Sequence, residues 1–483
     1  MKNNLAPINR IPSEIFSFIP EHFERDFRDK DLIAMTHSWR ALLITHPSFW
    51  TRLDCTNTDE TRVYIERSRS SPLELSLYDR GVTTFSKDAF LLVVPHISRI
   101  KSLAVDGTED LLLTLTPPLS CPLPHLRELA IEILADPAPV LEGTLFNGDL
   151  SFLYSLTLDG VITNLPWKTL WKITTLNLSF VPEGNPSITE PLDFFEGACH
   201  LREITLHYSI PTSSNAPPDR VVSLPWLKTL SIAMELANSI LLDHLCIPVG
   251  ASLTLDFDFD GDESPLLGCL PTSHGNLKNV LSLISVSLCL DDYEKHVRLD
   301  GPSGGLYMLG DWTNQDEDSL IHLNSQIVRS LTRFDLSGVQ RLASTKYGPP
   351  IIAQIDNSTP HYILLCTGDL RTLTLNQCNN LPFIVALNPD RNPSTRTLCP
   401  KLEELFLYVG YLESFDIKKL KSMTKARDSG GAKLRSITIV ALGELTPGAK
   451  ALLAKLNEYV TRVDYRVAEK LPRWDGVVED GDS

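Results

Sequence analysis

Residues 126–131 read Leu-Arg-Glu-Leu-Ala-Ile, with large apolar side chains at the first, fourth and sixth positions. Apolar side chains two residues apart are typical of a short strand that is buried on one face. Further copies of this spacing occur at residues 100–105, 153–158, 173–178, 201–206, 227–232, 370–375, 402–407 and 434–439. The early copies begin roughly 20 to 28 residues apart, and one copy alone cannot bury its own leucines. We therefore expect neighbouring copies to stack.

The copy at residues 370–381 is the most regular, and it reads Leu-Arg-Thr-Leu-Thr-Leu-Asn-Gln-Cys-Asn-Asn-Leu. It matches the leucine-rich repeat, in a form with cysteine at the turn after the strand. The fold class we predict is an α/β repeat, an irregular leucine-rich-repeat solenoid over residues 56–445 with strands on its concave side. We also predict that Cys378 is a buried free thiol.

Other local patterns predict single elements. We expect strands at residues 71–77, 253–259 and 283–290, and helices at 87–94 and about 192–198. A final helix should begin at Thr446-Pro447 and run to Val460, within a C-terminal cap over residues 446–470. Between residues 291 and 331 the repeat pattern is faint. Residues 471–483 form an acidic tail that we expect to be disordered.

The segment before the repeats, residues 8–50, predicts a helical module. Pro12 and Glu14 suit a first helical turn, and Asp29 or Asp31 can begin a second helix. The apolar side chains at helical spacing give this module more apolar surface than a unit of about forty residues can bury by itself. A partner helix is the usual way to cover such a surface.

Three pieces of this segment resemble an F-box. The family opens on Leu-Pro-x-Glu-Ile, carries a Trp-Arg pair late in its helices, and closes on Pro-x-x-Trp. The corresponding residues here are Ile11-Pro12-Ser13-Glu14-Ile15, Trp39-Arg40 and Pro47-Ser48-Phe49-Trp50. Residues 51–55 and 61–68 are similar to the F-box proteins expanded in mushroom-forming fungi. The resemblance implies an F-box over residues 1–55, with adaptor contacts from Ile11, Pro12, Ile15, Phe16, Ile19, Leu32, Met35, Trp39, Pro47 and Trp50.

The resemblance further implies a function. Such a protein is the substrate-recognition subunit of a cullin–RING ubiquitin ligase of the SCF type, and binds the cullin through the adaptor. It would be a non-catalytic receptor without cofactors, whose repeats hold an unidentified target protein. One departure keeps an alternative open: between His37 and Trp39 the family has a few more residues, whereas here only Ser38 stands there. The alternative is a leucine-rich interaction scaffold whose degenerate F-box recruits no ligase.

The target-binding residues that we predict lie between the inward leucines of the repeats, on the concave side. They are mixed in charge and show no aromatic cage or basic stripe, so they do not indicate the target. These residues are Arg127, Tyr154, Lys228, Arg371, Glu403 and Arg435.

The composition limits the classes of function. The 483 residues include 60 acidic and 44 basic side chains, which gives a formal net charge of −16. Nucleic-acid binding needs a basic footprint, and anionic membranes attract basic segments, so we expect neither partner. No uncharged apolar run approaches the length of a membrane span, and no signal region follows Met1. We expect a cytoplasmic or nuclear protein with reduced cysteines.

Two short motifs could carry other chemistry. Gly301-Pro302-Ser303-Gly304-Gly305 matches the nucleophile elbow of a hydrolase, which needs a buried strand before it and a helix after it. The surrounding sequence favours a turn instead. Residues 256–261, Asp-Phe-Asp-Phe-Asp-Gly, match the start of a calcium loop, but the twelfth position is Leu267 where the ligand should be glutamate. We interpret these aspartates as the solvent side of an alternating strand.

Overall fold

The computed structural model describes most of the chain beyond the N-terminal segment. The described residues are 45–80, 84–148, 150–164, 167–179, 188–207, 220–235, 240–258, 270–271, 274–290, 294–311, 317–345, 358–376, 380–391, 397–410 and 414–471. The chain forms two compact units, residues 1–205 and 206–483. Strand β9 (Glu203–His207) spans the boundary between these two ranges.

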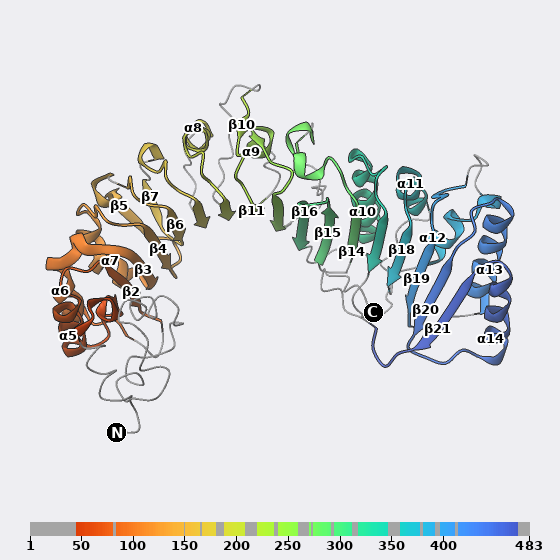
Figure 1. The fold of residues 1–483 in the computed structure, drawn as a ribbon, viewed down its shortest axis with the longest axis horizontal. Helices are drawn as coiled ribbons and strands as arrows, with labels where there is room; N and C mark the ends of the chain where they lie inside the picture. Colours follow the sequence, from red (N-terminus) through yellow and green to blue (C-terminus); the bar gives the residue numbers. More distant parts are fainter. Residues whose placement is uncertain are drawn as a thin grey trace, which may run out of the picture. The chain divides into compact units, whose positions relative to one another are not determined.

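The first unit is built on a parallel sheet (Figure 1). Its strands pair in chain order, β1 to β2 to β3 to β4 to β6 to β8, and every pairing is parallel. These strands are β1 (Arg52–Leu53), β2 (Leu73–Tyr78), β3 (Ile100–Gly107), β4 (Glu128–Ile133), β6 (Ser155–Asp159) and β8 (Thr175–Ser179). A separate parallel pair joins β5 (Val140–Thr144) and β7 (Ile162–Asn164).

Return segments of the first unit lie on one side of its sheet. They include α5 (Thr58–Ser68), α6 (Lys87–Val93), η4 (Val94–Arg99), α7 (Glu109–Leu119), η5 (Leu145–Gly148), η6 (Trp167–Thr169) and α8 (Thr189–Gly197). Local capping fixes where two of these helices begin. The Asn57 side chain accepts hydrogen bonds from the backbone N–H groups of Asp59 and Glu60, and Ser86 accepts one from that of Ala89.

Rows of buried side chains form the core of the first unit. Leu103, Leu129, Leu156 and Leu176 are in register on neighbouring strands, and each is at least 95% buried. Burying such a side chain stabilises a fold by about 1.5–3 kcal/mol relative to leaving it exposed. The apolar spacing found in the sequence therefore marks the inward positions of consecutive strands.

The second unit has a sheet of mixed direction. Its strands lie in the order β11–β13–β16–β15–β14–β17–β18–β19–β20–β21, and only the two pairings of β15 are antiparallel. The strands are β11 (Thr229–Glu235), β13 (Ser252–Asp258), β14 (Ser285–Leu290), β15 (Glu294–Asp300), β16 (Gly305–Asp311), β17 (Arg341–Thr345), β18 (Thr372–Asn376), β19 (Glu404–Val409), β20 (Ser436–Ala441) and β21 (Arg462–Val467). A separate short pair joins β10 (Val222–Ser223) and β12 (Leu245–Cys246).

Helices again cover one side of this sheet (Figure 1). They include α9 (Ile240–Asp243), η7 (His274–Asn276), η8 (Lys278–Val280), α10 (Glu317–Ser330), η9 (Leu331–Arg333), α11 (Thr359–Cys366), α12 (Asn380–Ala386), η10 (Pro389–Arg391) and α13 (Ser414–Ser429). The last helix is α14 (Pro447–Ala454), which continues as η11 (Lys455–Glu458). Thr446 caps it by accepting from the N–H of Ala449, so the predicted start is confirmed, and its α-helical part ends six residues before Val460.

The inserted strands explain why the repeat pattern is faint after residue 291. Strand β16 occupies the place beside β13 that the next repeat would take, and β14 pairs with β17 instead. Gly304 lies in the turn between β15 and β16, where a Cβ atom would come within 2.4 Å of the Ala251 carbonyl oxygen. The sequence predicted β14 but missed the antiparallel pairing that follows it.

The predicted α/β class is confirmed in its general form, with a mostly parallel sheet in each unit. The strands expected at 71–77, 253–259 and 283–290 correspond to β2, β13 and β14, and the helices expected at 87–94 and 192–198 correspond to α6 and α8. Among the described residues, no helix is both long enough and apolar enough to cross a membrane.

Candidate functional site

In the part of the chain that the structure describes, helices lie along one face of each sheet, and we call the other face its open face (Figure 1). Residues that alternate with the buried leucines point to it, since successive side chains of a strand lie on opposite sides. The open face therefore carries the side chains that the strands direct away from the described helices. The polar and aromatic side chains on it come from positions that the core does not constrain.

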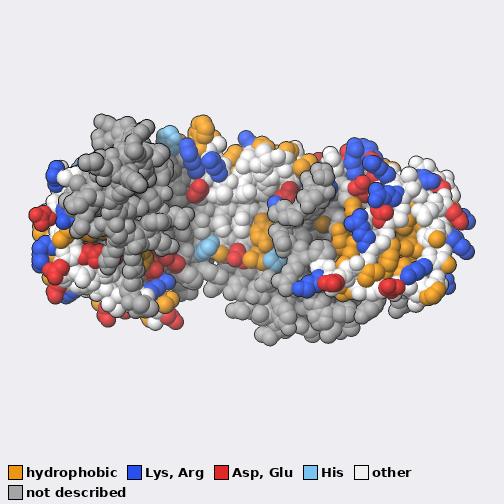
Figure 2. Space-filling model, turned by 60° about the horizontal axis from the view of Figure 1, so that its bottom comes forward, with side chains coloured by type: hydrophobic (Ala, Val, Ile, Leu, Met, Phe, Trp, Pro, Cys, Tyr) orange, Lys and Arg blue, Asp and Glu red, His pale blue; other side chains and the backbone are white. Residues whose placement is uncertain are grey.

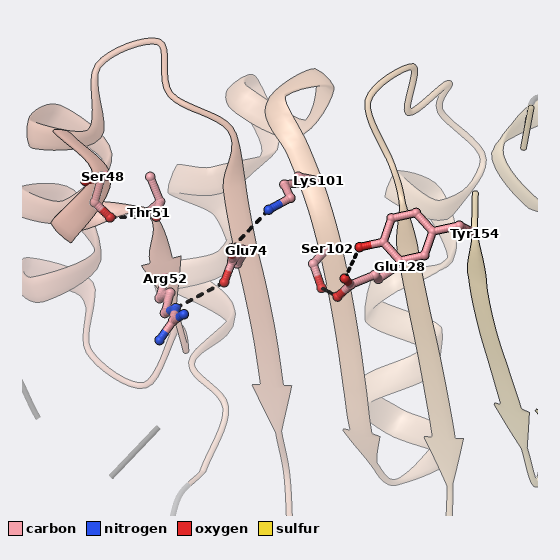
Figure 3. A network of polar contacts seen from close by, with 8 residues as sticks. All are labelled: Ser48, Thr51, Arg52, Glu74, Lys101, Ser102, Glu128 and Tyr154. Atoms are coloured by element: carbon pink, nitrogen blue, oxygen red, sulfur yellow. Dashed lines mark hydrogen bonds and ion pairs between the residues drawn. The ribbon is translucent and has the colours of Figure 1, made fainter. Parts of the chain in front are cut away.

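A polar network crosses the open face of the first unit near the strand starts (Figure 3). Glu74 on β2 lies between two cations, with its carboxylate 3.1 Å from Arg52 Nε and 3.5 Å from Lys101 Nζ. Ser102 on β3 donates a hydrogen bond of 3.1 Å to Glu128 on β4. These contacts join four neighbouring strands across the sheet.

Tyr154 completes this network from the residue before β6. Its hydroxyl donates to Glu128 Oε1. Burial, followed by the hydrogen bond to Glu128, raises the pKa of Tyr154 to about 12. The phenol therefore stays protonated and acts as a donor that holds the carboxylate in place, as expected for a positioning contact.

Acidic residues form a row at the other end of these strands. Asp106, Glu132 and Asp159 are in register on β3, β4 and β6. Arg80 pairs with Asp106. Since strands lie about 4.8 Å apart, the three carboxylates give this part of the first unit's open face a negative charge.

The open face of the second unit has a different character between β17 and β21. Phe406 and Tyr408 on β19 alternate with buried leucines, and Val440 on β20 is in register with Tyr408. We call Phe406, Tyr408 and Val440 the aromatic patch. Figure 2 shows hydrophobic side chains gathered on this part of the second unit, with Lys and Arg side chains among them.

Charged side chains border the aromatic patch at the strand starts. Arg371 and Glu403 precede β18 and β19 and form an ion pair of 3.7 Å. The backbone N–H of Arg435 donates to the carbonyl oxygen of Glu403 at 2.8 Å, which places the two residues side by side directly before the neighbouring strands β20 and β19. On β21, Arg462 contacts Asp464 at 2.8 Å, and Arg466 is in register with Val440.

The six predicted target-binding residues fall into separate places. Arg371, Glu403 and Arg435 lie together on the second unit, and Arg127 and Tyr154 lie together on the first unit. Lys228 is exposed before β11 and is not part of the group formed by Arg371, Glu403 and Arg435. The aromatic patch was not among the predicted binding residues, although the alternation Leu405-Phe406-Leu407-Tyr408-Val409 already places two aromatic rings on the outward side.

Most of the predicted adaptor-binding residues, from Ile11 to Trp39, lie outside the described residues. Pro47 and Trp50 are described, in the short helix η3 (Pro47–Trp50). Trp50 is only 4% exposed, because its ring packs edge-on against Tyr64 and under the guanidinium of Arg67, 4.4 Å from the ring centroid. This indole therefore packs within its own chain, against α5.

The alternative motifs find little support in the geometry. Ser303 is exposed in the turn between the antiparallel strands β15 and β16, so no helix follows it as a nucleophile elbow requires. Asp256 and Asp258 belong to β13, as the strand interpretation expected, and residues 259–267 of the calcium-loop match lie outside the described residues. Cys378 lies outside them too. Within the described ranges, no three His, Cys, Asp or Glu residues are arranged to hold a metal ion.

Comparison with known proteins adds no assignment. No family model matches this sequence, and no curated protein matches it significantly.

Proposed function

We propose that this chain is the substrate-recognition subunit of a cullin–RING ubiquitin ligase. The N-terminal segment binds the ligase adaptor as an F-box does, and the two units form an irregular leucine-rich-repeat receptor for a target protein. The chain itself makes and breaks no bonds. It raises the local concentration of target lysines near the charged conjugating enzyme.

The observation that carries this proposal is the position of Trp50. The tryptophan that ends the F-box-like sequence packs against α5, directly before the first parallel strands. An F-box followed by one strand per repeat is the order of elements that the resemblance implies. The contact attaches η3 to α5, and a receptor needs such an attachment between its F-box and its target-binding part if it is to hold the target at a defined distance.

The repeated register supports the receptor half of the proposal. Each parallel strand of β17 to β21 is paired residue for residue with the next, and the connecting helices lie on the other side. Such stacking leaves an extended open face whose outward side chains can vary without disturbing the core.

Titration calorimetry of the full chain against the ligase adaptor tests the proposal. We expect micromolar or tighter binding by the wild type and a loss of roughly thirtyfold or more for Ile15→Asp, since burying an unpaired charge in an interface is costly. Leu91→Asp is the matched control. It makes the same chemical change at a side chain on α6 that is 55% exposed, and it should bind like the wild type.

The absence of wild-type binding would contradict the ligase proposal and favour the scaffold alternative. In that case a variant with additional residues inserted before Trp39 distinguishes two explanations. Binding restored by the insertion identifies a degenerate F-box, and continued absence of binding removes the F-box assignment.

A further inference from the structure

The aromatic patch has the chemistry of a peptide-binding surface. Phe406 and Tyr408 project from the same side of β19, two residues apart, and Val440 adjoins Tyr408 on the next strand. All three side chains are partly exposed, while their strand neighbours Leu405, Leu407 and Ile439 are buried. Aromatic side chains are enriched at the centres of protein interfaces.

Arginines outnumber carboxylates around this patch. Among the described residues on the open side of β17 to β21 and at the strand starts, the cations are Arg341, Arg371, Arg435, Arg462 and Arg466, and the anions are Glu403, Glu404 and Asp464. Two arginines are already neutralised, Arg371 by Glu403 and Arg462 by Asp464. The remaining side chains leave a local surplus of positive charge in a chain of formal net charge −16.

The local surplus of positive charge favours an acidic ligand over a basic one. The overall charge of the chain attracts cations, so unspecific binding would favour a basic peptide. An acidic peptide gains attraction only close to the arginines, because salt screens charges beyond about 8 Å at physiological ionic strength. Preference for an acidic ligand is therefore a property of the patch and not of the whole molecule.

We propose that the aromatic patch binds an extended acidic peptide segment with two apolar anchors two residues apart. In an extended peptide such anchors lie on one side, at the same spacing as Phe406 and Tyr408. Acidic residues flanking the anchors face Arg435 and Arg466. Binding of this peptide does not depend on the proposed ligase function. The inference rests on that function only in identifying the peptide as a segment of the ligase target.

Fluorescence anisotropy with the full chain tests the proposal. The probe is a fluorescein-labelled dodecapeptide with a central Leu-Ser-Trp flanked by aspartates and glutamates, and its counterpart carries lysines at the acidic positions. We expect the acidic peptide to bind at least ~10-fold more tightly at low salt, with an affinity that falls as salt is added. No adaptor is present, so a failure here leaves the ligase proposal standing.

Three variants locate the binding surface. Phe406→Ala should weaken binding of the acidic peptide about tenfold or more, as at an aromatic interface anchor. Arg466→Glu replaces an exposed side chain, so it keeps the fold while reversing one charge, and it should weaken binding several-fold and flatten the salt dependence. Arg202→Glu makes the same charge reversal at an exposed side chain of the first unit and should leave binding unchanged.

Specific outcomes overturn the proposal. These are equal or tighter binding of the lysine peptide, no binding of either peptide at ~1 mM, or full affinity in both Phe406→Ala and Arg466→Glu. A single-stranded oligonucleotide of the same charge serves as competitor. If it displaces the acidic peptide at equal concentration, the arginines recognise charge alone and the assignment to a peptide fails.

Discussion

At the scale of single residues, Gly160 has the narrowest tolerance among the glycines that the structure describes. It follows β6 with a φ of +63°, and an added Cβ would lie 2.1 Å from the carbonyl oxygen of Ile133 at the end of β4. L-residues are strained in this region of φ, and here backbone atoms fill the space as well. The close approach lets the chain turn away from the sheet directly after the strand.

Gly160→Ala should therefore lower the free energy of unfolding by at least ~2 kcal/mol. Gly431→Ala separates strain from steric conflict, because Gly431 has a φ of +75° but no atom within 4 Å of the added Cβ. It should cost about 1 kcal/mol. Gly197→Ala, which meets neither restriction, should be nearly neutral. Urea denaturation measures the free energy of unfolding of all three variants. Equal losses in Gly160→Ala and Gly197→Ala would refute the claim that backbone strain and steric conflict restrict position 160 to glycine.

Cys399 is a second residue whose surroundings determine its chemistry. Its thiol donates a hydrogen bond of 3.2 Å to the carbonyl oxygen of Leu364, and its own carbonyl accepts one of 2.9 Å from the buried Arg427. Burial raises the pKa of the Cys399 thiol from 9.0 to about 11 and lowers the pKa of the Arg427 guanidinium. The neutral thiol is therefore the form that the fold stabilises.

Stability should fall as the pH rises from 9 towards 11, because the unfolded thiol loses its proton at a lower pH than the folded one. The contribution of Cys399 is complete below pH 9, so Cys399→Ala should flatten the decline above it. Cys121→Ala, at an exposed cysteine, should leave the pH dependence unchanged. Denaturation midpoints at several pH values measure this, and identical curves for wild type and Cys399→Ala would count against it.

At the scale of elements, the contact between η3 and α5 fixes the position of η3 in the first unit. Trp50 and Tyr64 meet with ring centroids 5.0 Å apart, in the edge-to-face arrangement that aromatic pairs prefer. Arg67 from the last turn of α5 adds its guanidinium over the indole. One side chain of η3 therefore contacts two residues of α5 that are about one helical turn apart.

Trp50→Ala should destabilise the first unit by about 3–5 kcal/mol, since it removes a large buried ring. Trp50→Phe, which keeps part of the packing, should cost less. Trp226→Ala is the matched control, because Trp226 is 63% exposed. Thermal denaturation followed by circular dichroism is the measurement. A Trp50→Ala variant as stable as Trp226→Ala would show that η3 is not anchored by this ring.

The elements also show what the sequence could and could not predict. The inward leucines identify their strands because a buried face leaves little freedom in residue type, as at Leu129 and Leu156. The antiparallel strands β15 and β16 were not predicted, because the order of strands in a sheet depends on pairing between distant parts of the chain. In addition, the fully buried Lys295 occupies a position on β15 where the apolar pattern requires an apolar residue. Phe406 and Tyr408 were not predicted to bind a target, because every predicted target-binding residue directly follows the first leucine of its copy, at the start of the strand. These two rings follow the second and third leucines instead.

At the scale of the whole molecule, the two compact units should respond separately to local damage. In the parallel part of each sheet, a strand pairs only with its direct neighbours. Stability in such arrays is approximately a sum of local terms. The loss of stability caused by a substitution in one turn should therefore be felt mainly by the neighbouring strands of the same unit.

Hydrogen exchange followed by mass spectrometry can measure this spread. In Gly160→Ala, amide exchange should accelerate in β4, β6 and β8 by at least ~10-fold, while β18 to β20 exchange as in the wild type. Gly431→Ala should show a smaller acceleration that is confined to the second unit. Uniform acceleration over both units in Gly160→Ala would indicate a single cooperative unit instead.

The reversed strand order around β15 has a consequence for synthesis on the ribosome. In the main sheet of the first unit each new strand can dock on the strand of that sheet made before it. After β13 this succession is interrupted, because the second neighbour of β13 is β16, which emerges about 50 residues later. At translation rates of about 5–20 residues per second, the edge of β13 waits roughly 3 to 10 seconds for its partner. During this interval the nascent chain exposes the unpaired edge of β13. Chaperones and neighbouring nascent chains can therefore contact this edge before β16 covers it.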